Sequence, residues 1–235
     1  MLAAILFSLE YGFFTNFKIM ASKGNAPPFN SDQLKGDFLE FVIKYRGFPD
    51  DLSFFCEVYN IKEADFYSVF NSLDALHSDI WKSFIIETID VLREDPHYGS
   101  FSVREQLLAF YFTHMEILKP RREFIQVCDK LSQQLPIPSY LNAHKEQFAS
   151  YSEGLINAGL KTGEVADRKM INRSYANGLW LQLIFVVKFW IKDESPEFEK
   201  TDAAIEKAVN LSAEMVRPGP IDSIIDFAKF IYQNR

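Results

Sequence analysis

The chain has 235 residues, of which 48% are hydrophobic and 24% charged, and its formal net charge is −7. This balance is ordinary for a folded protein with a sizeable core, and the negative charge argues against nonspecific attraction to nucleic acid or anionic lipid over the whole surface. Two cysteines without Cys-x-x-Cys spacing and four histidines without metal-ligand spacing predict a reduced, cytoplasmic protein with no metal site and no cofactor.

The N-terminal segment is apolar but short. "MLAAILF" has no basic residues before it, and Glu10 interrupts the apolar stretch that follows. It therefore matches neither a signal peptide nor a membrane span. A polar stretch, typical of a flexible protein start, begins at Met20. We expect residues 1–30 to form a flexible extension.

The region that follows predicts three short helices. In "NSDQLKGDFLEFVIKYRG" apolar residues recur three and four positions apart, with Ser31 or Asp32 as the N-terminal cap and Gly47 as the stop. "PDDLSFFCEVYN" and "IKEADFYSVF" supply the second and third helices. They are joined at Asn60, because asparagine tolerates the left-handed backbone that a turn there needs.

The rest of the chain predicts longer helices. Ser72 caps a helix that runs to Pro96, with Asp74 in its first turn, where the helix dipole favours a negative charge. Helical periodicity continues to the C-terminus, so we expect about nine or ten helices and no strand. Residues 179–191 are apolar on every side but too short to span a bilayer. They predict either a central core helix or a helix shared with another subunit.

Three short helices, a long fourth helix and a larger helical body resemble the layout of the TetR family of transcription regulators. The resemblance is strongest from Leu39 to Leu76, and "GLKTGEV" resembles the family's loop before its dimer helices. It implies an all-α, TetR-like fold with a three-helix helix-turn-helix unit at 31–76 and a C-terminal helical ligand-binding and dimerisation domain at 77–235. The matching positions are the Gly that ends "FVIKYRG", Phe55, Cys56, Asn60, Ile61, Tyr67, Phe70 and Leu76.

The resemblance implies a homodimer that binds operator DNA and responds to an apolar small molecule. It places Lys62, Asp65 and Tyr67 on the DNA-contacting surface. The chain departs from the family where Ala64 and Asp65 replace small or polar groups and a threonine, and where Leu73 replaces a phosphate-binding lysine. The alternatives are that Tyr67 only packs helices together and that Lys62 is an ordinary surface lysine.

The charge of the expected DNA-binding unit favours a second hypothesis. Residues 31–76 hold four basic and nine acidic side chains, so their net charge is 4 − 9 = −5, and phosphate contacts supply most sequence-independent affinity. The layout is also similar to that of a ubiquinone-biosynthesis accessory protein of mitochondria, a TetR-type fold that holds an isoprenoid lipid instead of DNA. Candidate residues for contact with an apolar small molecule or lipid, each also explicable as plain core, are Trp81, Phe84, Phe110, Phe112, Phe185 and Trp190.

The helices at 178–191 and 198–216 are the candidates for a dimer interface, a four-helix arrangement across a two-fold axis. The alternative is that both helices only complete the core of one subunit. Leu183→Glu separates the two, since it gives a soluble monomer in the first case and unfolding in the second. No nucleophile–base pair or phosphate loop emerges, so we do not expect an enzyme. The candidate interface residues are Trp180, Leu183, Phe189, Ala204 and Ala208.

Overall fold

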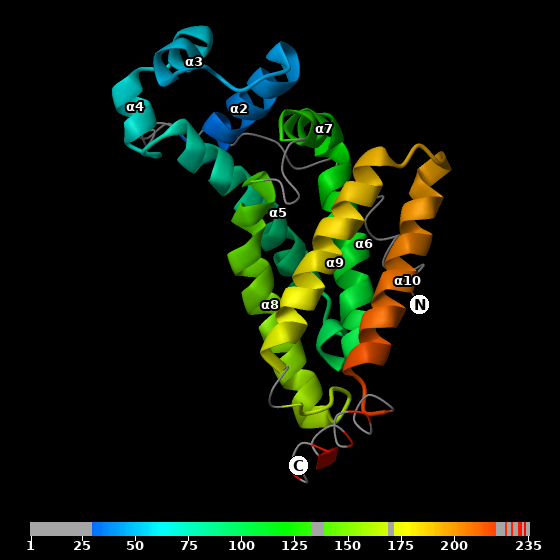
Figure 1. The fold of residues 1–235 in the computed structure, drawn as a ribbon. Helices are drawn as coiled ribbons and strands as arrows, with labels where there is room; N and C mark the ends of the chain where they lie inside the picture. Colours follow the sequence, from blue (N-terminus) through cyan, green and yellow to red (C-terminus); the bar gives the residue numbers. More distant parts are fainter. Residues whose placement is uncertain are drawn as a thin grey trace.

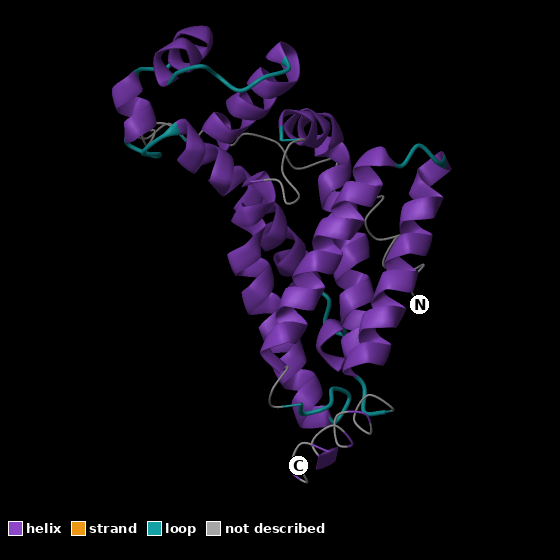
Figure 2. Ribbon diagram, viewed as in Figure 1, coloured by secondary structure: helices purple, strands orange, loops and turns teal. Residues whose placement is uncertain are grey.

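The computed structural model describes residues 30–132, 139–168 and 172–219, together with positions 224, 227, 230, 231 and 233. All regular structure within these residues is helical and none is strand (Figure 2), which confirms the all-α prediction. Residues 1–29, which make up nearly all of the expected N-terminal extension, lie outside the described residues. No described helix combines the length and the apolar character that crossing a membrane requires.

Three short helices gather at one end of the molecule (Figure 1). They are α2 (Ser31–Tyr45), α3 (Leu52–Tyr59) and α4 (Glu63–Tyr67), and together they are called the trio below. Their order and approximate positions are those predicted from the sequence. The helices of the trio are short, and helices of this length are marginal alone in water. Packing must therefore hold them in place.

The ends of the trio's helices follow local side-chain chemistry. The cap of α2 is Asn30, one residue before the predicted Ser31, and its side chain accepts a hydrogen bond from the Asp32 amide at 3.0 Å. At the other end Arg46 takes a left-handed conformation with φ of 54°, so α2 ends just before Gly47, the predicted stop. Asn60 is left-handed as predicted, with φ of 52° and ψ of 44°.

Phenylalanine rings fill the centre of the trio. Phe55 of α3 lies 6.1 Å from Phe38 and 6.0 Å from Phe41, both of α2, measured between ring centroids. It also lies 6.3 Å from Phe66 of α4. All four rings are buried. Such ring pairs add about 0.5–1.5 kcal/mol each beyond area burial, so this cluster fixes how α4 sits on α2 and α3.

Helix α5 (Leu73–Glu94) connects the trio to the rest of the molecule (Figure 1). The predicted cap is confirmed, because Ser72 Oγ accepts a hydrogen bond from the Ala75 amide at 3.1 Å, and Asp74 lies in the first turn. Near its start α5 meets α2, where the rings of Phe38 and His77 are 5.5 Å apart. Farther along, α5 packs between α6 and α8.

The body is a bundle of roughly aligned helices around α6 (Figure 1). Helix α6 is buried along most of its length and begins with a capping box between Ser102 and Glu105. The remaining elements are η1 (Tyr98–Ser100), α6 (Val103–Leu118), η2 (Lys119–Arg121), α7 (Arg122–Leu131), η3 (Ser139–Leu141), α8 (Asn142–Thr162), α9 (Asn172–Lys192), η4 (Pro196–Phe198) and α10 (Glu199–Val216).

Helix α7 touches both the trio and the end of α9. Arg122 Nη2 donates hydrogen bonds to the carbonyl oxygens of Ile191 at 3.0 Å and Asp193 at 2.8 Å, which satisfies groups that a helix C-terminus leaves open. The next residue, Glu123, pairs with Arg46 of the trio. Helix α7 therefore links the trio to the C-terminal end of α9.

Candidate functional site

Helix α4 presents a small exposed surface at the tip of the trio. Lys62, immediately before α4, is exposed, and its side chain makes no capping hydrogen bond. Tyr67 is 53% exposed, whereas its neighbour Phe66 takes the buried position. Asp65 is half-buried, and the Glu63 carboxylate accepts a hydrogen bond from the Ser53 hydroxyl. The structure therefore places the three predicted DNA-contacting residues on one short helix and its cap.

Two of the trio's four basic side chains pair with the body. Arg46 Nη2 lies 2.6 Å from Glu123 Oε1, and Lys35 Nζ lies 2.8 Å from Asp79 Oδ2. Both partners belong to helices outside the trio. These two cations are therefore turned toward α7 and α5, a relationship that only the folded chain reveals.

The other two basic groups of the trio are Lys44 and Lys62. Within the described part of the chain neither forms a salt bridge with a carboxylate, and Lys44 Nζ lies 5.3 Å from the centre of the Tyr45 ring. A surface that carries few unpaired cations gains little from counterion release on binding DNA. The electrostatics of the trio therefore limit how tightly it can hold a phosphate backbone.

Three of the six predicted ligand-contacting residues lie together in the core, and the other three are scattered. Trp81, Phe84 and Phe110 are buried around two histidines that the sequence analysis did not single out, His114 and His144. The ring of His144 lies 5.2 Å from Trp81 and 6.4 Å from Phe84, and the ring of His114 lies 5.6 Å from Phe110. Helices α5, α6 and α8 thus bring three predicted residues to one place.

The other three predicted ligand residues lie elsewhere. Trp190 is buried near the end of α9, against the guanidinium of Arg122 at 5.6 Å and the ring of Phe198 at 6.0 Å. Phe112 is half-buried on α6. Phe185 is 50% exposed on the outer side of α9, so the structure groups it with the predicted interface residues.

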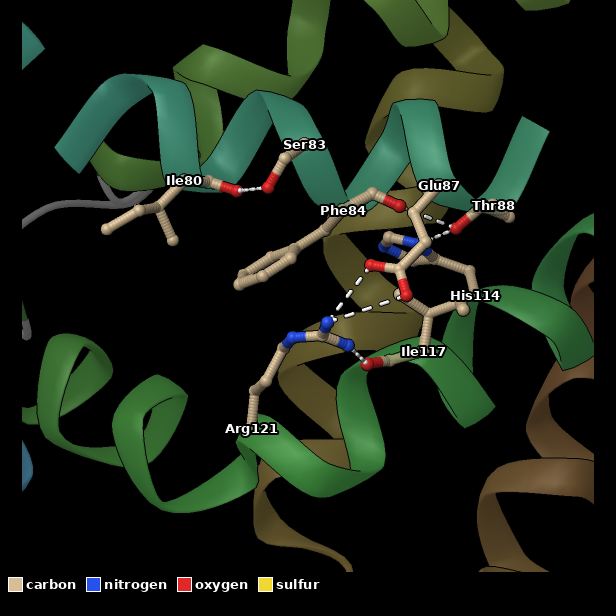
Figure 3. Close-up of polar contacts among 8 residues, drawn as sticks. All are labelled: Ile80, Ser83, Phe84, Glu87, Thr88, His114, Ile117 and Arg121. Atoms are coloured by element: carbon tan, nitrogen blue, oxygen red, sulfur yellow. Dashed lines mark hydrogen bonds and ion pairs between the residues drawn. The ribbon is translucent and has the colours of Figure 1, made fainter. Parts of the chain in front are cut away.

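The two histidines, His114 and His144, are fully buried and 5.6 Å apart between ring centroids. Figure 3 shows His114 beside Thr88, whose hydroxyl lies 2.8 Å from Nδ1, together with the ion pair of Arg121 and Glu87. Nε2 of His114 and both ring nitrogens of His144 make no hydrogen bond of ordinary geometry. In the sequence, the one sign of this buried pair is that each histidine lies in a stretch predicted to be helical.

Burial keeps both imidazoles neutral. It lowers the pKa of His114 well below its usual value, and the nearby His144 adds to the effect. Burial lowers the pKa of His144 to about 3, although the Trp81 carbonyl nearby opposes part of the shift. Each ring therefore carries one N–H and one bare nitrogen at neutral pH. No group of His, Cys, Asp and Glu among the described residues could hold a metal ion.

A cleft of about 530 Å³ lies between α5, α6 and α8, and neither histidine lines it. Its inner wall includes Tyr151, whose ring stacks on Phe110 at 4.7 Å, and Phe110 in turn stacks on His114. Gln147 also lines the cleft, and its buried Oε1 has no hydrogen-bond partner. Two stacked rings thus separate the cleft from the imidazole of His114.

A larger and more apolar groove, of about 1010 Å³, runs along α9 and α10, which lie side by side in Figure 1. It is called the α9/α10 face below. Leu181 is 58% exposed on it, and the rings of Phe185 and Phe189 are 6.0 Å apart. The residues lining it are Ser174, Tyr175, Gly178, Leu179, Leu181, Gln182, Phe185, Phe189, Lys200, Ala203, Ala204, Lys207, Ala208, Leu211, Ser212, Met215 and Val216.

The five predicted interface residues do not share one surface. Phe189, Ala204 and Ala208 line the α9/α10 face. Trp180 and Leu183 are buried inside the protomer, Trp180 with its ring 6.3 Å from Phe148, because they lie on the opposite side of α9. These two side chains are buried in the protomer, whereas the outward side of α9 carries exposed apolar residues such as Leu181 and Phe185.

Comparison with known proteins decides the family. Residues 106–231, more than half of the chain, match the family described as tetracyclin repressor-like, C-terminal domain. The chain belongs to the TetR family. That family is one of transcription regulators, and the resemblance noted in the sequence is confirmed. No curated protein matches the chain.

Solved structures share the fold of this chain. A bacterial regulatory protein of the tetR family from Rhodococcus RHA1 is 12% identical, with a TM-score of 0.52 over 80% of this chain and 96% of that one. A protein of unknown function from Rhodococcus sp. RHA1 is 11% identical, with a TM-score of 0.51 over 83% of this chain and 98% of that one. At these identities the likeness concerns the fold alone.

Proposed function

We propose that this TetR-family protein is a homodimeric, ligand-responsive regulator that contacts operator DNA through the trio at residues 31–76 and binds an apolar small molecule in the body at residues 77–235. The observation that carries the proposal is the α9/α10 face. A groove lined mostly by apolar side chains is costly to leave in water, and contiguous apolar surface of this kind marks an interaction site. The occupant we infer is a second copy of the chain.

The composition of the α9/α10 face suits contact with its own copy. Ala203, Ala204 and Ala208 leave room for a helix to approach α10 closely, and Phe185 and Leu181 project beside them. Two helices from each protomer would then form a four-helix interface around a two-fold axis. In such an arrangement each exposed ring of one copy meets the small residues of the other.

The trio supplies the proposed contact with DNA. Lys62 and the hydroxyl of Tyr67 are the exposed donors on α4 and its cap. Because affinity for DNA depends on salt in proportion to the number of phosphates contacted, we expect weak binding with a shallow salt dependence. Phosphate contacts would position the trio, and few side chains would remain to read bases.

Helix α7 offers a route by which the body can act on the trio. It is joined to the trio through Glu123 and to the end of α9 through Arg122. A ligand that separates α5 from α8 would change how α5 and α7 support α2. Binding would therefore shift the balance between two arrangements of the trio within the dimer.

A second candidate function is favoured by one observation. Because Arg46 and Lys35 pair with the body, the trio has few cations left to contact DNA phosphates. A TetR-fold protein that holds an isoprenoid or another lipid, and does not bind DNA, is consistent with this lack of free positive charge. The buried rings around His114 would then serve lipid binding as the main activity. The two candidates share the dimer and differ at the trio.

Sedimentation of purified variants tests the dimer. Phe185→Glu places a charge on the α9/α10 face and should give a folded monomer. Leu131→Glu is the matched control, since Leu131 is an exposed leucine on α7, away from that face, and it should remain dimeric. A wild-type protein that sediments as a monomer would refute the proposed assembly.

Titration with DNA across a range of salt concentrations separates the two candidates. Genomic fragments selected at low salt should be enriched for a defined site, and Lys62→Ala should lower affinity and flatten the salt dependence by about one unit of slope. Lys161→Ala, an exposed lysine at the far end of α8, should change neither. Absence of any enriched site, together with a co-purified apolar molecule in native mass spectra, would favour the second candidate.

A further inference from the structure

His114 is a polar group that the body buries without fully satisfying it. It is fully buried, and its Nε2 has no hydrogen-bond partner. An unpartnered polar atom in an apolar interior costs about 1–3 kcal/mol, and most buried polar groups are satisfied. Nε2 of His114 is therefore free to form a hydrogen bond. The contacts of the other ring nitrogen decide whether it donates or accepts.

The hydroxyl of Thr88 fixes the tautomer of His114 (Figure 3). Thr88 Oγ1 lies 2.7 Å from the carbonyl oxygen of Phe84, which can only accept, so the single hydroxyl hydrogen points there. Toward His114 Nδ1, 2.8 Å away, Thr88 Oγ1 can then only accept. Nδ1 must carry the ring hydrogen, and in a neutral imidazole Nε2 is left bare. His114 thus offers a buried hydrogen-bond acceptor.

We propose that the ligand of the body is an apolar molecule that carries a hydroxyl group, and that this hydroxyl donates its hydrogen to Nε2 of His114. The inference rests on the proposed function, because it names the chemistry of the ligand that the body binds. The ring of His144 is 5.6 Å away and lies near the carbonyl oxygen of Trp81, so the acceptor that defines the site is Nε2 of His114. A hydroxyl can donate to that nitrogen.

The same geometry excludes other head groups. A carboxylate accepts only, so it cannot satisfy the bare Nε2 of His114 while that ring stays neutral. An ether or a ketone likewise has no hydrogen to donate. The aromatic rings of Trp81, Phe84 and Phe110 surround the site, which favours an apolar remainder.

The cleft between α5, α6 and α8 provides the way in. Its volume of about 530 Å³ lies in the range of small-molecule sites. Tyr151 and Phe110 stand between the cleft and His114 as a stack, so entry of the head group requires these two rings to turn aside. The apolar part of the ligand would then remain between α5 and α8.

Binding of two matched probes tests the proposal. The probes are 4-octylphenol and 4-octylanisole, which differ only by replacement of the O–H hydrogen with a methyl group. Isothermal titration of the full-length protein should show at least tenfold tighter binding of the phenol. In His114→Phe this preference should vanish. His97→Phe, a change at an exposed histidine in the turn after α5, should keep it. Decanoic acid should bind more weakly than 1-decanol.

Two further measurements keep the outcome decisive. If His114→Phe does not fold, Thr88→Val serves instead, because it removes the acceptor that holds the tautomer and should reduce the preference for the phenol. Nitrogen-15 spectra of labelled wild-type protein should show His114 with the hydrogen on Nδ1. Equal affinity for the two probes, binding of neither probe, or a hydrogen on Nε2 would each overturn the proposal. DNA is absent from these measurements, so a failure to regulate DNA would leave the ligand result standing.

Discussion

The guanidinium of Arg46 lies 2.6 Å from the carboxylate of Glu123, so a cation of the trio faces the body of its own chain. Both side chains are more than half exposed, and an ion pair of this kind contributes at most about 1 kcal/mol to stability. Its larger effect is on the charge that the trio can offer to DNA. This relationship leads to the first prediction.

Glu123→Gln should strengthen binding to DNA. The change removes the partner of Arg46 and leaves that cation free to approach a phosphate, so affinity should rise and the salt dependence should become steeper. Fluorescence anisotropy with a labelled duplex at several salt concentrations measures both. Glu153→Gln makes the same change of charge at an exposed position on α8 and should have a smaller effect. Equal effects of the two variants would show that only net charge matters.

Leu183 and Leu181 lie on opposite sides of α9 and should respond differently to truncation. Leu183 is fully buried and Leu181 is 58% exposed. Leu183→Ala should lower the free energy of unfolding by about 2–5 kcal/mol, through lost burial and a cavity. Leu181→Ala should leave the protomer's stability nearly unchanged and weaken the dimer. Urea denaturation at low protein concentration reports the first effect, and a dilution series reports the second. A large loss of protomer stability in Leu181→Ala would contradict this assignment of faces.

Stability should fall as the pH is lowered from neutral toward 5. Burial lowers the pKa of His77 to about 4 and that of His144 to about 3, while the unfolded chain takes up protons near pH 6.5. Below that pH the unfolded state binds more protons, so each histidine reduces stability by about 1.4 kcal/mol per pH unit until its folded pKa is reached. Urea midpoints at pH 7.5, 6.0 and 5.0 measure the slope. His144→Phe should reduce the slope, and an unchanged slope in that variant would contradict this account.

Arg122→Met should loosen the end of α9. The guanidinium donates to the carbonyl oxygens of Ile191 and Asp193, and methionine keeps an apolar chain beside Trp190 but offers no donor. Hydrogen exchange should therefore speed up near residues 190–193, and stability should fall by about 1–3 kcal/mol. Lys130→Met, on an exposed side of α7, is the control. Unchanged exchange in Arg122→Met would show that these carbonyl contacts contribute little.

Local features of the fold were predictable from the sequence. The turn at Asn60 and the cap at Ser72 follow from the chemistry of single residues, and the helical periodicity gives the order of the helices. The stop predicted at Gly47 was close as well, since α2 ends at Tyr45 and Arg46 takes the left-handed conformation.

The candidate sites depended on contacts between distant residues. Hydrophobicity marked α9 as apolar but could not tell which side faces inward, so it gave no means of separating the buried Leu183 from the exposed Phe185. The tautomer of His114 depends on Thr88, which is 26 positions away in the chain. The pairing of Lys35 and Arg46 with the body depends on tertiary structure in the same way.

The brevity of α4 limits what the trio can recognise. With five residues and a rise of about 1.5 Å for each, the helix is about 7.5 Å long, which equals roughly two base-pair steps along a duplex at about 3.4 Å per step. The few base pairs that α4 of one protomer could contact are too few to specify a unique site in a genome. In the proposed dimer, selectivity would have to come from the separation between two half-sites, which contact through the α9/α10 face would set.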